Sequence, residues 1–490
     1  MEWLKEKLSK ENIIKIIFVF SALAFALPSI RYLIENKTTF KFGPYFKFFL
    51  NDYYGRLDQT LIYLCILLAL TVAYFGILKL HKKMFKNTKS IFIFIIIISL
   101  IFVIVLPFMC SDVFYYLGVG RLASKYSQNP YYVTIKQFVE QSNNIEYLKN
   151  DTVLAQGYMN DWADSTVVYG PIWTLICQIV AGMSFGNIDI GLLLFKLINV
   201  LIHILNCYII YKITNKKFFV LLYGINPFVL IEGISSVHND IFVVCFILSS
   251  LYFLLKKKNL VNSVICLALA TAIKYFSILL LPFIVIYYFR KEKPSKRFIK
   301  CILYGLLFLG IVALTYVMYI RDYQVLSGLA TQQGKIAKNF YVIIIEYFTE
   351  PVGLVNIVNK LLLSGFVIIY FFTCIIMLNK RKITFREQMQ KYNYFLMAFI
   401  FLLITNFQPW YIMWLFPILM WQKKDIMKLI VQISLISEFS NGVFLTYGEG
   451  WKNGTPYTFI MVTSVLIAIV INNKANEKRK LKTKNNIREK

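Results

Sequence analysis

Apolar residues in this chain come in long runs that short basic connectors separate. The run from Ser90 to Phe108, SIFIFIIIISLIFVIVLPF, carries no charge. It has roughly the 20 residues that a helix needs to cross about 30 Å of hydrocarbon. Similar runs lie near 13–34, 60–80, 188–211, 299–320, 355–378, 425–445 and 456–472. The pattern predicts an all-α polytopic membrane protein.

Basic connectors set the predicted topology, because Lys and Arg are retained on the cytoplasmic side. They lie at 79–89, 212–217, 256–258, 290–300, 380–391 and 423–428. An even number of crossings must separate neighbouring connectors, so the stretches 217–256, 259–289 and 393–422 must each turn back. The turns fall at SSVHND, IKYFS and NFQPWY, where Pro409 cannot continue a helix. We expect about fourteen crossings in the cell membrane, with both termini cytoplasmic.

The same topology leaves one large external loop after the third span, at residues 110–189, in which acidic residues outnumber basic ones. Inside it, residues 169–186 (YGPIWTLICQIVAGMSFG) are apolar but short for a span. We interpret this segment as a helix lying in, or dipping into, the outer membrane face.

The loop and the connectors suggest a division of the chain. We expect residues 1–89 to form an N-terminal two-span region, and residues 90–300 to form a transmembrane module that contains the loop and would carry any catalytic site. Residues 301–472 form a C-terminal transmembrane region, and residues 473–490 form a basic cytoplasmic tail.

Composition agrees with this pattern. Hydrophobic residues make up 58% of the 490 residues and charged residues 16%, against an apolar share of about 45 to 50% in soluble domains. The net charge of +28 lies mostly in connectors and tail, which indicates topology rather than nucleic-acid binding. The eight cysteines are scattered singly and there are three histidines. We therefore expect neither a disulfide framework nor a structural metal, and a need for a divalent cation stays open.

Three polar turns meet on the predicted external face: SDVFYY at the start of the loop, HND, and QPWY. Lys274 approaches from the same side. Ionisable residues at membrane depth are costly and usually face a cavity. Their convergence predicts a functional site.

Five motifs in order resemble those of GT-C membrane glycosyltransferases, and most closely the bacterial polyprenol-phosphate-mannose-dependent mannosyltransferases. They are SDVFYYLGVGRLASKYSQNPYYV, VYGPIWTLICQIV, NPFVLIEGISSVHNDIFVVCFILSS, ALATAIKYFSILLLPF and PWYIMWLFP, within Ile91 to Pro417. The resemblance implies an all-helical fold, a lipid-linked monophosphate sugar as donor, and Asp112 as catalytic base. Many relatives carry two acids there, whereas this chain has Ser111 before Asp112 and Val113 after it.

The resemblance implies transfer of a hexose, in the first place mannose, to a lipid or glycan acceptor outside the cytoplasm, and the residue types suit this chemistry. A carboxylate such as Asp112 can take the proton of the acceptor hydroxyl. Lys274, or alternatively Arg121, can stabilise charge on the departing phosphate. Sugar rings stack on aromatic side chains and bond to amides and acids. The remaining candidates for substrate binding are Tyr115, Asn129, Tyr169, His238, Asn239, Asp240, Gln408, Trp410 and Tyr411.

Simpler alternatives stay open. Asp112 could cap the helix that follows it, His238 could be a packing residue, Lys274 could extend to the interface, and the aromatic residues could form an interfacial belt. GVGRLA matches GxGxxA, but without a preceding strand a nucleotide site is disfavoured. A polytopic transporter or flippase for a lipid-linked glycan is the alternative function, although no internal repeat supports it.

Overall fold

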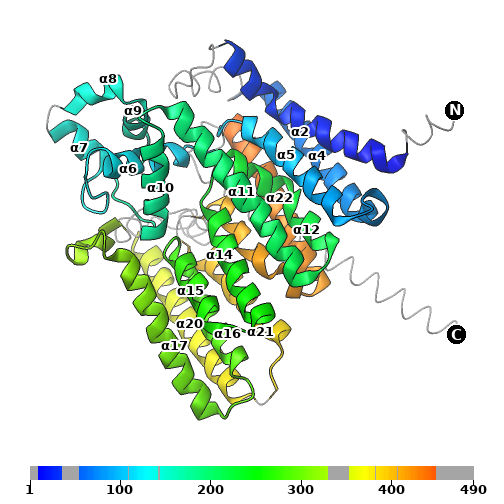
Figure 1. Cartoon of the computed structure of the whole chain (residues 1–490), viewed down its shortest axis with the longest axis vertical. Coiled ribbons are helices and arrows are strands. Elements are labelled where there is room, and N and C mark those ends of the chain that lie inside the picture. The colour runs from blue at the N-terminus through cyan, green and yellow to red at the C-terminus, as the bar shows by residue number, and fades with distance from the viewer. Residues whose placement is uncertain are drawn as a thin grey trace.

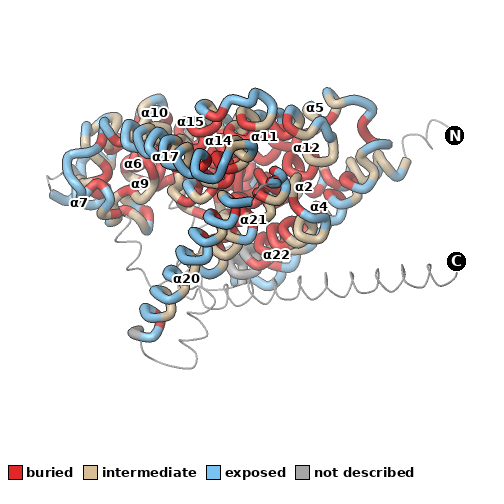
Figure 2. Tube along the Cα trace, turned by 90° about the horizontal axis from the view of Figure 1, so that it is seen from below, coloured by how far each residue is buried: buried red, intermediate tan, exposed pale blue. Residues whose placement is uncertain are grey.

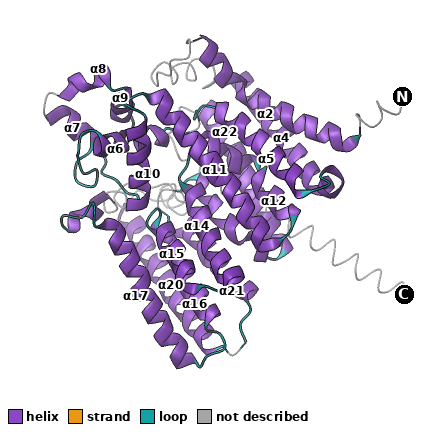
Figure 3. Ribbon diagram, in the orientation of Figure 1, coloured by secondary structure: helices purple, strands orange, loops and turns teal. Residues whose placement is uncertain are grey.

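The computed structural model describes residues 9–35, 55–108, 110–141, 144–328, 352–380, 382–404 and 407–447. Over these residues the chain consists of helices and loops without a strand (Figures 1 and 3), which confirms the all-α prediction. The expected span at 456–472 and the expected tail at 473–490 lie outside the described residues.

Five helices of the described part are long and apolar enough to cross a membrane. They are α2 (Lys10–Glu35), α4 (Leu57–Met84), α11 (Ile188–Thr214), α17 (Pro294–Tyr316) and α20 (Val352–Asn379). A bent pair, α12 (Lys217–Gly224) followed by α13 (Pro227–Leu230) and η2 (Ile231–Ser235), raises the number to six and bends by 53°. The expected count of about fourteen is therefore not confirmed.

Several predicted crossings are helices of 17 residues or fewer, or are interrupted. The apolar run from Ser90 to Phe108 forms α5 (Thr88–Ile104). Residues 259–289 form α15 (Leu260–Thr271), the 3-10 helix η4 (Tyr275–Leu280) and α16 (Leu281–Tyr288). Residues 393–422 include parts of α21 (Phe385–Ala398), η6 (Phe399–Leu403) and η7 (Pro409–Trp421). The breaks after η2, α15 and η6 fall at the three predicted turns. Helix α14 (Asp240–Tyr252) follows η2, and α22 (Lys424–Tyr447) follows η7.

The predicted external loop is itself helical and forms a cluster at one end of the molecule (Figure 1). It contains α6 (Asp112–Ser124), α7 (Ile135–Gln141), η1 (Asn144–Glu146), α8 (Tyr147–Asn150), α9 (Thr152–Tyr158) and α10 (Pro171–Met183). The predicted apolar helix is α10, whose 13 residues rise only about 20 Å, less than the hydrocarbon core. Its position at the membrane face stays a prediction.

Two glycines of the GVGRLA segment allow α6 to pack closely on its neighbours. A Cβ on Gly118 would lie 2.6 Å from the Cα of Gly157 in α9, and a Cβ on Gly120 would lie 2.1 Å from the Cys177 carbonyl oxygen in α10. These glycines therefore serve helix packing, which explains the motif without a nucleotide.

Helix α14 lies in the interior, where buried residues concentrate, and α11 packs one of its faces against it (Figure 2). Four buried polar side chains follow one face of α11 at spacings of three and four residues. They bond backbone carbonyls of the bent segment and its neighbours: Lys196 to Val105 and Ser235, Asn199 to Gly233, His203 to Gly224, and Asn206 to Ile241. Because helix breaks leave carbonyls without intrahelical partners, this face of α11 stabilises the break.

Candidate active site

A cavity of about 480 Å³ opens where three segments of the chain meet. The first segment is the start of α6, the second is the loop between α9 and α10, and the third is the start of η7. The lining residues are Cys110, Ser111, Asp112, Tyr115, Asp161, Trp162, Ser165, Thr166, Val168, Tyr169, Gln408, Trp410 and Tyr411. The third wall comes from the C-terminal region, so the predicted catalytic module of residues 90–300 does not enclose the cavity alone.

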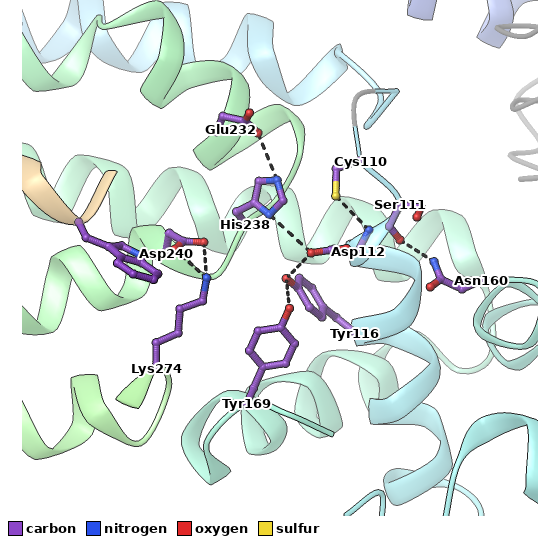
Figure 4. A network of polar contacts seen from close by, with 11 residues as sticks. Cys110, Ser111, Asp112, Tyr116, Asn160, Tyr169, Glu232, His238, Asp240 and Lys274 are labelled. Carbon is purple, nitrogen blue, oxygen red and sulfur yellow. Dashed lines mark hydrogen bonds and ion pairs between the residues drawn. The ribbon is translucent and has the colours of Figure 1, made fainter. Parts of the chain in front are cut away.

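Asp112 is the first residue of α6, and the loop of residues 105–111 joins it to the apolar helix α5, which ends at Ile104. Its side chain is 14% exposed and lines the cavity. The Tyr116 hydroxyl donates to the Asp112 carboxylate at 3.3 Å and lies 3.2 Å from the Tyr169 hydroxyl (Figure 4). A tyrosine side chain thus holds the carboxylate, whereas a capping role would use a backbone N–H. Asn160 donates to the Ser111 carbonyl at 2.9 Å and fixes this helix start.

His238 comes to the same place from the turn between η2 and α14. Its fully buried ring has Nδ1 3.9 Å from the Asp112 carboxylate and Nε2 3.1 Å from the Glu232 carboxylate (Figure 4). One face of the ring stacks on Trp410, with centroids 3.8 Å apart. The histidine therefore lies between the carboxylates of Asp112 and Glu232 and packs against Trp410 in the wall of the cavity.

Lys274 and Asp240 form a buried ion pair behind the aromatic wall. The Lys274 ammonium lies 2.7 and 2.8 Å from the two Asp240 oxygens, and the Trp414 indole N–H also donates to this carboxylate. The ammonium lies 4.8 Å from the ring centroid of Tyr411 and 6.0 Å from that of Tyr169, and both residues line the cavity. The positive charge is thus held next to the cavity by an acid and by ring faces.

The loop that carries Tyr169 is fixed against the turn before Lys274. Gly170 donates to the Ile273 carbonyl at 3.1 Å, and a Cβ at Gly170 would lie 2.2 Å from the Ala272 carbonyl oxygen. Only glycine allows this backbone approach. It explains how Tyr169 and Lys274, far apart in sequence, come together.

Nine of the twelve predicted site residues lie at the cavity or beside it. Asp112, Tyr115, Tyr169, Gln408, Trp410 and Tyr411 line it, and His238, Asp240 and Lys274 lie behind this lining. Asn239 follows in the same turn; its side chain is fully buried, and neither its oxygen nor its nitrogen has a hydrogen-bond partner in the described structure.

Arg121 and Asn129 lie outside the cavity lining. The Arg121 guanidinium donates to Asp151 at 2.6 Å, and Asn129 donates to the Tyr319 carbonyl at 2.6 Å. Asp151 also accepts from the Tyr126 hydroxyl at 2.9 Å. Burial, together with this carboxylate, raises the pKa of the Tyr126 phenol, which therefore remains a donor. Arg121 and Asn129 stabilise the loop cluster in this structure.

Sequence reasoning did not select several residues that belong to this site. Glu232 contacts His238, Tyr116 holds Asp112, and Asp161 and Trp162 form part of the lining. Glu232 has a recognisable signal, because it is a single acid in the apolar run NPFVLIEGISS. The thiol of Cys110 also lies here, and its sulfur, an Asp112 oxygen and a His238 nitrogen lie within 4.8 Å of one another. These three residues could hold a metal ion.

Comparison with known proteins shows which family the chain belongs to. The family model described as alpha-(1->6)-mannopyranosyltransferase, N-terminal domain, matches residues 20–290, more than half of the chain. The chain belongs to this family. The match confirms the resemblance to membrane mannosyltransferases and contains every candidate residue except those at 408–411.

A mycobacterial protein is similar to this chain. The Alpha-(1->6)-mannopyranosyltransferase A of Mycobacterium tuberculosis (strain ATCC 25618 / H37Rv) is 25% identical over 209 residues. The aligned part is 41% of this chain and 39% of that relative, so the chain spans well under half the length of the relative that it matches. No solved structure matches the chain.

Proposed function

We propose that the protein is an integral membrane enzyme that transfers mannose from a polyprenyl-phosphate donor to a lipid or glycan acceptor. The reaction takes place on the extracytoplasmic side of a multi-pass protein with cytoplasmic termini, and the family description favours an α-1,6 linkage. One observation carries the proposal: in a chain of this family, the Asp112 carboxylate lines an aromatic cavity at the end of an apolar helix. A substrate with a lipid tail and a sugar head needs a site where the apolar membrane interior meets a polar cavity.

Asp112 acts as the general base in this proposal. The acceptor hydroxyl loses its proton to the carboxylate while its oxygen bonds to the anomeric carbon of mannose. The bond from that carbon to the phosphate oxygen breaks, and polyprenyl phosphate leaves with the electron pair. The Tyr116 hydroxyl orients the carboxylate toward the cavity.

Lys274 stabilises the negative charge that develops on the departing phosphate. An ammonium has three N–H donors, and Asp240 uses at most two of them. Arg121 is less suited to this role, because Asp151 already binds its guanidinium away from the cavity lining. Lys274 is therefore the phosphate ligand in our proposal.

Aromatic and amide side chains hold the sugar. Trp410, Tyr411, Tyr115 and Tyr169 present rings or hydroxyls at the lining, and Gln408 adds an amide. Sugar rings stack their C–H faces on such side chains and bond through their hydroxyl edges. His238 positions Trp410 through the stacked ring pair.

The test uses purified full-length protein in nanodiscs, with polyprenyl-phosphate mannose, glucose or arabinose as radiolabelled donors and extracted membrane lipids as acceptors. We expect mannose to be transferred and an α-1,6-specific mannosidase to release the label. Transfer from none of the donors, together with movement of a lipid-linked glycan across the membrane, would favour the transporter alternative and contradict the proposal.

A further inference from the structure

We propose that Cys110, Asp112 and His238 bind one divalent cation of the zinc class at the inner end of the cavity. The three residues come from two separate parts of the chain, the approach to α6 and the turn before α14. One ligand atom from each lies within 4.8 Å of the other two. This site is an addition to the proposed transferase activity, and its existence does not depend on that activity.

The distances fit a tetrahedral ion after a small contraction. Zinc bonds of about 2.0 to 2.3 Å at tetrahedral angles place ligand atoms about 3.3 to 3.8 Å apart. His238 Nδ1 and the Asp112 oxygen are 3.9 Å apart, too far for a hydrogen bond but close to that spacing. Neither ring nitrogen of His238 makes a hydrogen bond in the described part of the chain, although the side chain is fully buried, and Nδ1 is the nitrogen that faces Asp112. An ion would satisfy this nitrogen.

The surroundings of His238 match those of a metal ligand. Its other ring nitrogen, Nε2, lies 3.1 Å from the Glu232 carboxylate. Metal-bound histidines commonly donate their second N–H to a carboxylate, which fixes the tautomer and leaves the first nitrogen free to bind. Glu232 would orient the histidine in this way without being a ligand itself.

Charge balance supports a divalent ion in this buried place. Cys110 is 7% exposed, and its sulfur accepts a hydrogen bond from the Asp112 backbone N–H at 3.4 Å. On binding, the thiol gives its proton to solvent, and the thiolate and the Asp112 carboxylate together neutralise the two positive charges. Neutralisation removes much of the cost of burying an ion.

The ligand types select the metal. A thiolate and an imidazole with one carboxylate suit zinc or cobalt, whereas magnesium prefers oxygen ligands alone. Three protein ligands leave a fourth position, and both Cys110 and Asp112 line the cavity. An acceptor hydroxyl could take this position and ionise more easily there, with the second Asp112 oxygen left to accept its proton.

The experiment titrates Co²⁺ into chelator-treated full-length protein in nanodiscs and follows sulfur-to-cobalt charge-transfer absorption. We expect one Co²⁺ per chain, displaced by Zn²⁺, and the absorption should disappear in Cys110→Ser. His238→Gln should weaken binding at least about tenfold. The matched control is Cys245→Ser, because Cys245 is 6% exposed and lies in α14; it should bind as the wild type does.

Measurements on the wild type keep the proposal testable if a variant fails to fold. Zn²⁺ should raise the unfolding temperature of the wild-type protein and slow alkylation of Cys110. Absent charge-transfer absorption in the folded wild type, or unchanged absorption in Cys110→Ser, would overturn the metal site. Mannose transfer by protein that binds no Co²⁺ would overturn the metal site alone, and Co²⁺ binding without transfer from any donor would overturn the transferase alone.

Discussion

Replacing Lys274 with methionine separates two roles of this residue, because the side chain neutralises Asp240 and, in our proposal, also contacts the donor phosphate. The methionine keeps an apolar side chain of similar length but removes the ammonium, which lies 4.8 Å from the ring centroid of Tyr411 and 5.3 Å from that of Trp414. The Asp240 carboxylate, with a fully buried side chain, then loses the partner at 2.7 Å and keeps the Trp414 donor.

The structure sets the expected size of this effect. Breaking a buried ion pair by removing one partner costs about 3 to 5 kcal/mol, because an uncompensated charge stays buried. Lys274→Met alone should lower the free energy of unfolding by about this amount. Adding Asp240→Asn removes the second charge and should recover most of the loss.

Unfolding by SDS in mixed micelles measures the stability of the four proteins in this double-mutant cycle, and mannose transfer measures their activity. The double variant should be nearly as stable as the wild type yet transfer mannose at least about a hundredfold more slowly. Asp240→Asn alone serves as the control and should keep more activity than the double variant. A stable double variant with wild-type transfer would show that Lys274 only neutralises Asp240 and would refute the phosphate role.

Three further predictions follow from contacts elsewhere in the site and its support. Trp410→Ala removes the ring stacked on His238 and should raise the KM for the donor about three- to tenfold; an unchanged KM would argue against sugar stacking. Gly120→Ala forces a Cβ to within 2.1 Å of a carbonyl oxygen and should destabilise the protein by about 1 to 3 kcal/mol, while Gly182→Ala, whose nearest neighbour is at 3.6 Å, should have little effect. Lys196→Met removes the donor to two buried carbonyls and should lower the free energy of unfolding in SDS by at least about 1 to 3 kcal/mol. A variant as stable as the wild type would contradict the view that Lys196 stabilises the helix break.

Charge and apolar length were enough to predict much of the helix arrangement. The turn before Lys274 was predicted because the ends of the stretch 259–289 are both basic, and α15 does end at Thr271. Pro409 was expected to break a helix, and η7 begins there. The number of crossings was not predictable in this way, because 3-10 and π segments, such as η2 and η6, interrupt apolar runs without any change in composition.

The candidate site could be predicted only as far as polar residues stand out in apolar surroundings. Asp112, His238 and Lys274 are conspicuous for that reason, and in the structure Asp112 lines the cavity while His238 and Lys274 lie directly behind its lining. Arg121 is equally conspicuous, but its partner Asp151 is 30 residues away and only the packing of α6 on α9 reveals it. The partner carbonyls of Lys196 are invisible in sequence as well, because backbone groups carry no residue-specific signal.

The most direct test of the central claim is single-turnover transfer of mannose from polyprenyl-phosphate mannose by wild type and by Asp112→Asn, with donor binding measured alongside. If Asp112 takes the acceptor proton, the variant should bind donor as the wild type does and transfer mannose about 100- to 10,000-fold more slowly. A folded Asp112→Asn protein whose transfer rate equals that of the wild type would contradict the account.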